Sequence, residues 1–178
     1  MKTKLLIIIS LLISGAIYAQ EKAKNKETKA EKASRMEMEY LATERIIDST
    51  SFVLTADYLS NQHGYRRIAE PMLNFIEVDS SYAVIQTGNS FGMGYNGVGG
   101  LTVSGKISNW NVRKDVLHKS FTIRMSISSP VGFYDIFMNV NASGKAIATL
   151  TGITRGELIF EGNLIPLEES RTFEGSHI

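Results

Sequence analysis

Residues 88–92 read Gly-Asn-Ser-Phe-Gly, a G-x-S-x-G pattern whose central residue, Ser90, is a candidate nucleophile. In enzymes that use this pattern, the glycines permit a strained strand-to-helix turn that lifts the serine hydroxyl toward a histidine and an oxyanion hole. Four glycines in residues 93–100 argue against such a helix and lead directly into a β pattern. We therefore expect a flexible connection at Ser90, and a serine hydrolase is the alternative hypothesis.

The histidines add little support for catalysis or for metal binding. A triad at the candidate serine would need Asp115 or Asp135 together with His118 or His177, and neither histidine has a distinctive neighbourhood. With His63, the three histidines share no helical or hairpin spacing, and the chain has no cysteine. Pairs of histidine and cysteine at short spacing are the usual sequence sign of a zinc site. We therefore expect no metal and assign no catalytic residue.

Residues 92–97 also match G-x-G-x-x-G, the pattern of dinucleotide-binding loops. That pattern works within a βαβ unit, where it directs the N-terminus of a helix at the pyrophosphate. No helix pattern follows here, so we expect neither a dinucleotide nor any other cofactor.

The same glycine-rich stretch carries the candidate ligand-binding residues Phe91, Met93, Tyr95 and Val98. Apolar and aromatic side chains on long loops are often where ligand contacts occur, because a rigid scaffold positions such loops for function. The competing interpretation is that these side chains fold back as a lid over the end of the domain. Both interpretations stay open at this point.

Residues 28–48 favour a helix that leads the fold. They contain neither glycine nor proline, and they place Ala33, Met36, Tyr40 and Ile47 on one stripe. The first half of this segment is too polar to pack, so we expect only the face from Met36 to Ile47 to contact the rest of the domain.

After the helix, apolar residues recur at every second position, which is typical of strands. Residues 61–70 are polar and end at Pro71, so they are predicted to be a connection. Tight turns between the strands predict a mainly β fold, an antiparallel meander of about eight strands that forms a barrel or a sandwich. The expected strands are residues 52–58, 72–78, 82–87, 101–110, 120–128, 133–140, 145–151 and 157–165.

The first residues have the form of a secretory signal peptide. Lys2 and Lys4 precede an apolar run at residues 5–13, and Ala19 is a small residue suited to cleavage before Gln20. The run is shorter than the roughly 20 apolar residues that a membrane-spanning helix needs. We expect residues 1–19 to be removed and no later segment to span a membrane, which makes the mature protein periplasmic or secreted.

Composition predicts one domain behind a charged tether. Residues 20–35 hold many charges and no large apolar side chain, which is typical of a solvated tether. Residues 36–178 are expected to form a single β-rich domain with its leading helix. The absence of cysteine excludes disulfides and a lipid-modified cysteine. A net charge of +1 gives no sign of nucleic-acid binding.

An ordered series of short segments resembles a known protein family. The segments are LNFIEVD (73–79), AVIQ (83–86), NGVGGLTV (96–103), GKI (105–107), YDI (134–136), SGKA (143–146) and FEG (160–162), behind a leading helix that runs into residues 52–57. They are similar to the domain of unknown function family 4251, exported proteins of Bacteroidetes, over nearly all of the mature chain. The resemblance implies a β-rich envelope protein with an N-terminal helix and no catalytic residue. Many members look like lipoproteins with an acylated cysteine, which this chain lacks.

The leading hypothesis is a non-enzymatic envelope module that uses the glycine-rich loop and the adjacent barrel mouth. Its partner would be a small apolar or glycan-like ligand or an envelope protein. The alternatives are a hydrolase at Ser90 and a purely structural periplasmic protein. A lined cavity would favour ligand binding, whereas a filled interior would leave only the surface.

Overall fold

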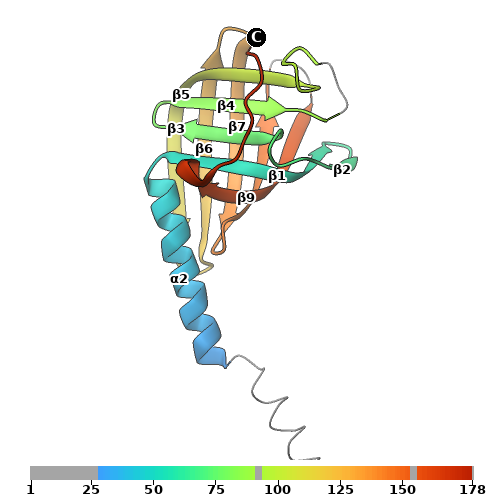
Figure 1. Cartoon of the computed structure of the whole chain (residues 1–178). Coiled ribbons are helices and arrows are strands. Elements are labelled where there is room, and N and C mark those ends of the chain that lie inside the picture. Colours follow the sequence, from blue (N-terminus) through green and yellow to red (C-terminus); the bar gives the residue numbers. More distant parts are fainter. Residues whose placement is uncertain (1–27, 91–93, 153–155, 178) are drawn as a thin grey trace, which may run out of the picture. The chain divides into compact units, whose positions relative to one another are not determined.

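The computed structural model describes residues 28–90, 94–152 and 156–177. Within these ranges the chain forms a leading helix, nine strands of one antiparallel sheet and a short 3-10 helix (Figure 1). The predicted mainly β fold is confirmed, and the sheet closes as a barrel. The elements are α2 (Lys29–Asp48), β1 (Ser51–Asn61), β2 (Arg66–Ile68), β3 (Phe75–Asp79), β4 (Tyr82–Thr87), β5 (Leu101–Asp115), β6 (Ser120–Ser129), β7 (Gly132–Asn141), β8 (Lys145–Thr151), β9 (Glu157–Pro166) and η1 (Leu167–Glu169).

The barrel closes because β1 pairs with strands on both of its edges. One edge pairs with β9 from Phe52 to Asn61, with an irregularity between Ala56 and Tyr58. The other edge pairs first with β3 and then, from Tyr58 to Ser60, with the short strand β2. The remaining strands follow in chain order as antiparallel neighbours from β3 to β9. Eight strands therefore form the closed barrel, and β2 is an addition at its β1 edge.

Large apolar side chains fill the inside of this barrel. Buried and more exposed residues alternate along β6 and β7, as expected for strands with one face on a core. Phe121, Ile123 and Met138 are buried with Phe52 and Phe160 in one cluster. The described interior is thus a packed core, which limits any ligand space to the ends and outer surface of the barrel.

The outer face of β3, β4 and β5 is covered by residues 170–177, which cross these strands in dark red in Figure 1. The Phe173 amide donates to the Met72 carbonyl at 2.9 Å, and the Gln86 side chain donates to the Phe173 carbonyl at 2.8 Å. Phe75 and Gln86 lie opposite each other on this face and are both fully buried. The C-terminal segment is therefore a second layer over part of the sheet.

The helix begins with a capping box in which Thr28 and Glu31 exchange hydrogen bonds. From Met36 onward it belongs to the same compact unit as the barrel. Tyr40 stacks on Phe121 with ring centroids 4.7 Å apart, and the Thr43 hydroxyl donates to the Ala142 carbonyl at 2.8 Å. The helix thus packs against the barrel end that carries the β5–β6 and β7–β8 turns.

Ion pairs hold the same helix segment to the β5–β6 hairpin. Lys114 lies 3.0 Å from Glu44 and 2.8 Å from Asp48, and Lys119 lies 2.6 Å from Glu37. These pairs are partly exposed, so each contributes at most about 1 kcal/mol. Stacking and burial of Tyr40 and Ile47 therefore do more to fix the helix than the charges.

Two expectations need correction. Met36 was predicted to begin the packed face of the helix, yet it is exposed, because the buried residues of the helix are Tyr40, Thr43 and Ile47. Residues 61–70 were predicted to be a plain connection, yet they contain β2. All three residues of β2 are exposed, so the alternation that marks a half-buried strand is missing.

A matched pair of isoleucines tests which face holds the fold. Ile123→Ala removes a fully buried side chain and should lower the unfolding free energy by about 2–5 kcal/mol. Ile147→Ala, on a side chain that is half exposed, should cost under about 1 kcal/mol. Urea denaturation of both variants measures the difference. Equal losses would show that the barrel interior is not the main core.

Candidate functional site

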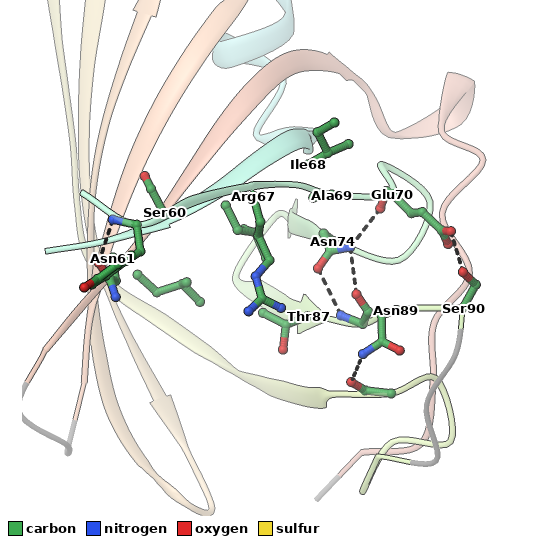
Figure 2. A pocket seen from close by; sticks show the side chains of 15 residues that line it. Ser60, Asn61, Arg67, Ile68, Ala69, Glu70, Asn74, Thr87, Asn89 and Ser90 are labelled. Atoms are coloured by element: carbon green, nitrogen blue, oxygen red, sulfur yellow. Dashed lines mark hydrogen bonds between the residues drawn. The ribbon is translucent and has the colours of Figure 1, made fainter. Parts of the chain in front are cut away.

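A pocket of about 680 Å³ lies at the barrel mouth beside β2 (Figure 2). Its base is formed by Leu59 and Leu158, which pack against the core cluster, and its walls come from β2, the approach to β3 and the glycine-rich segment. The volume falls within the range of about 300–1,000 Å³ that is usual for small-molecule sites. The lining residues are Leu59, Ser60, Asn61, Tyr65, Arg67, Ile68, Ala69, Glu70, Asn74, Thr87, Gly88, Asn89, Ser90, Gly99 and Leu158.

The β1–β2 turn positions the cationic wall of this pocket. The Asn61 side-chain oxygen accepts hydrogen bonds from the amides of His63 and Tyr65, and Gly64 takes the positive φ of 81° that the turn requires. The chain then returns along β1 with Arg67 opposite Leu59. Figure 2 shows the Arg67 side chain extending from β2 into the middle of the lining residues, toward Thr87.

Asn74 builds the opposite wall by joining two backbone segments. It is 1% exposed, donates to the carbonyls of Glu70 and Gly88 at 3.0 Å, and accepts from the Gly88 amide at 3.0 Å. Gly88 has no room for a side chain, because a Cβ there would lie 2.7 Å from the Val98 carbonyl oxygen. The wall is therefore fixed by buried hydrogen bonds.

The described part of the glycine-rich segment is held by Asn96, which is 2% exposed. Its side-chain oxygen accepts from the amides of Val98 and Gly100, and its nitrogen donates to the Thr87 carbonyl and the Thr102 hydroxyl. A buried amide with all these partners orders the backbone around it. Residues 96–100 are thus part of the fold and support the pocket wall.

Of the predicted ligand-binding residues, Phe91 and Met93 lie outside the described residues. Tyr95 is 88% exposed, and Val98 lies against the C-terminal segment, where a Cβ on Gly175 would be 3.0 Å from the Val98 methyl. Neither of these two lines the pocket. Gly88, Asn89, Ser90 and Gly99 from the same stretch do line it. Ligand binding by the four residues named from the sequence therefore stays a prediction, while their neighbours form the described pocket.

Ser90 lies on the pocket rim, and its hydroxyl donates to Glu70 at 2.7 Å. Its expected triad partners lie elsewhere. His118 pairs with Asp115 at 2.9 Å, His177 contacts Ser104 and Glu174, and Asp135 accepts from Ser126. In the described part of the chain, the next element after Ser90 is strand β5 and not the helix that the elbow pattern requires. The described residues therefore do not assemble the nucleophile, base and carboxylate that a hydrolase at Ser90 needs.

The dinucleotide pattern fails for the same reason. Gly97 has a φ of 77° within a turn that leads to β5, and the described residues of this stretch offer no helix N-terminus to a pyrophosphate. Among the residues that the structure describes, no three His, Asp or Glu side chains come together as possible metal ligands.

A second polar cluster lies on the outer face under the C-terminal segment. His177 Nδ1 is 2.8 Å from the Ser104 hydroxyl, and its Nε2 is 2.5 Å from Glu174. Burial raises the pKa of Glu77, and the charges of Glu174 and Asp79 raise it further. The His177–Ser104 hydrogen bond ties the C-terminal segment to β5, whereas the like charges of Glu77 and Glu174 oppose that contact; none of these residues lines the mouth pocket.

The sequence analysis missed the β2 side of the pocket, above all Arg67. Tyr65, Arg67 and Ile68 fall in the stretch interpreted as a polar connection. The signal that was available is local: an Asn-x-x-Gly turn, here residues 61–64, also joins β7 to β8 at residues 141–144. In both turns the asparagine side chain accepts from the amide two residues ahead. The repeated turn chemistry indicates a hairpin, and with it a strand, after residue 64.

Comparison with known proteins agrees with the fold just described. The model of the family described as Domain of unknown function (DUF4251) matches residues 34–164. The chain belongs to this family. The crystal structure of a DUF4251 family protein from Bacteroides eggerthii is similar, with a TM-score of 0.62 and 24% sequence identity over 75% of this chain and 91% of that one. No curated protein matches.

Membership in DUF4251 confirms the resemblance drawn from the ordered segments, and the structural neighbour supports the helix and barrel architecture. Neither match names a ligand or an activity. Within the described part of this DUF4251 chain, no helix combines the length and apolar character that crossing a membrane requires.

The raised pKa of Glu77 predicts a pH-dependent stability. A carboxyl whose pKa is raised by folding stabilises the fold fully below the ordinary glutamate pKa, and this contribution is lost as pH rises through the raised value. Glu77→Gln removes a partly buried charge, so it should raise the unfolding free energy near pH 7 and lose this advantage at about pH 3. Urea denaturation at the two pH values measures it.

The exposed Glu168 provides the control, because Glu168→Gln should change stability little at either pH. A Glu77→Gln variant that is less stable than the unmodified protein near neutral pH would contradict the assigned cause.

Proposed function

We propose that this DUF4251 protein is a non-enzymatic binding module whose mouth pocket takes a small ligand with an apolar part. The observation that carries the proposal is the pocket of about 680 Å³ between β2, the strand ends and the glycine-rich segment. Its base is apolar, while amide and hydroxyl groups from Asn61, Thr87 and Asn89 line its walls. An apolar base with a few convergent polar groups is the usual composition of a small-molecule site.

The construction of the walls supports binding over a purely structural role. Asn74 and Asn96 each use buried hydrogen bonds to fix the backbone that borders the pocket. Rigid walls lower the cost of binding, because the protein loses less conformational entropy when a ligand enters an ordered site. The exposed aromatic ring of Tyr65 also lines the pocket and offers further contact surface.

A hydrolase receives less support from the same geometry. The Ser90 hydroxyl donates a hydrogen bond to Glu70, and among the described residues no histidine is bonded to either side chain. Within the described residues, Ser90 therefore lacks the histidine base that the G-x-S-x-G enzymes use for acyl transfer.

A blocking substitution tests the pocket directly. Ala69→Trp places an indole among the lining residues and keeps the backbone bond from the Ala69 amide to Asp57, so the fold should survive. Binding of the neutral apolar dye Nile red, followed by fluorescence, should weaken at least tenfold. Ala42→Trp on the exposed face of α2 is the matched control and should leave the affinity unchanged. Equal affinities in both variants would place apolar binding elsewhere.

We also propose that the module works outside the cytoplasm, in the periplasm or after secretion. The support is the sequence of residues 1–19, with Lys2 and Lys4 before a short apolar run and Ala19 at its end. Intact-mass measurement of the protein recovered from the envelope fraction should show a chain that starts at Gln20 without lipid. A chain that retains Met1 would refute the proposed export.

A further inference from the structure

Arg67 is the only cationic residue among those that line the pocket. Within the described residues, no hydrogen bond, ion pair or ring contact satisfies its guanidinium. A guanidinium carries five donors in a planar fork that matches the two oxygens of a carboxylate. The pocket therefore presents an unused site for a planar anion.

The neighbouring Arg66, on the same strand, has partners for its guanidinium. Arg66 donates to Glu161 through Nε and through Nη2 at 2.8 Å, and its guanidinium lies 3.5 Å from the centre of the Tyr58 ring. The β1–β2 register places Arg66 opposite Ser60 and Arg67 opposite Leu59. Adjacent residues of a strand point to opposite faces, so one arginine serves the outer surface and the other the pocket.

The acidic residue of the pocket does not neutralise Arg67. Glu70 accepts the Ser90 hydroxyl, and Figure 2 shows this pair at the edge of the group, apart from the Arg67 guanidinium. An anion entering the pocket would thus find its attractive partner on the β2 side and a repulsive one across the rim.

Beside Arg67 the pocket is apolar and shallow. Leu59 faces the pocket and pairs in register with Phe160, which is fully buried and closes the interior beneath it. An aliphatic chain can cover Leu59 and Leu158 but cannot pass deeper. A longer chain would leave through the open mouth, where Tyr65 lines the pocket and is 77% exposed.

Building on the mouth pocket proposed above as the binding site, we propose that its ligand is a medium-chain aliphatic carboxylate. The carboxylate oxygens accept hydrogen bonds from Arg67, and the chain covers Leu59 and Leu158. The charged end gives specificity because the exposed Arg67 guanidinium offers parallel donors to both carboxylate oxygens, and the chain supplies apolar burial.

Titration calorimetry with octanoate and octan-1-ol tests the assignment, because the two probes share a chain and differ in charge. The unmodified protein should bind octanoate about threefold to fivefold more tightly than octan-1-ol, as expected for an ion pair with the exposed Arg67 side chain. Arg67→Gln should remove this preference and leave octan-1-ol binding unchanged. Arg66→Gln, the matched control one residue away, should keep the preference.

The outcomes separate this inference from the proposed function. Equal binding of both probes to the unmodified protein would overturn the carboxylate assignment while the apolar pocket stands. A preference for octanoate that survives Arg67→Gln would also overturn it, since the anion would then bind elsewhere. If neither probe binds while Nile red does, the ligand class is wrong, and if none of the three binds, the proposed binding function fails as well.

Discussion

The mouth of the barrel depends on the buried side-chain amide of Gln86. This residue lies on the outer face of β4 with no exposed surface, so each of its polar atoms needs a partner. Its oxygen accepts from the Thr102 hydroxyl at 2.7 Å and the Gly175 amide at 2.8 Å, and its nitrogen donates to the carbonyls of Leu73 and Phe173. Leaving such a group unsatisfied costs about 1–3 kcal/mol, so β5, the approach to β3 and the C-terminal segment are held together.

The two ends of the barrel are stabilised by different interactions. At the helix end, Tyr40 and Ile47 cover the core with apolar contacts, and ion pairs from Lys114 and Lys119 add to them. At the mouth, backbone segments without regular pairing are tied by the side chains of Asn74 and Asn96, which replace the sheet ladder as hydrogen-bond partners. Polar groups at the mouth are thus already ordered, which makes this end suited to recognition.

Regular alternation made most of the fold predictable, because the described barrel strands bury one face against a single core. The site was harder to predict, because its parts lack that periodicity. β2 is exposed at every position, and Asn96 is buried within a glycine-rich stretch that its composition marks as flexible. The hydroxyl of Ser90 fits a catalytic pattern in sequence, but Glu70 is its hydrogen-bond partner, a contact across twenty residues that no local pattern reveals.

A single irregularity in β1 gives the pocket its chemistry. Before it, Phe52, Leu54 and Ala56 contribute to the core; the register with β9 then shifts between Ala56 and Tyr58. One extra residue in a strand moves every following side chain to the other face. Leu59 therefore lies on the core side opposite Phe160, and Arg67, paired with Leu59, lies beside it at the mouth. Without the bulge Leu59 and Arg67 would face away from the pocket, so Asp57, the residue without a β9 partner, determines where the proposed amphipathic ligand would bind.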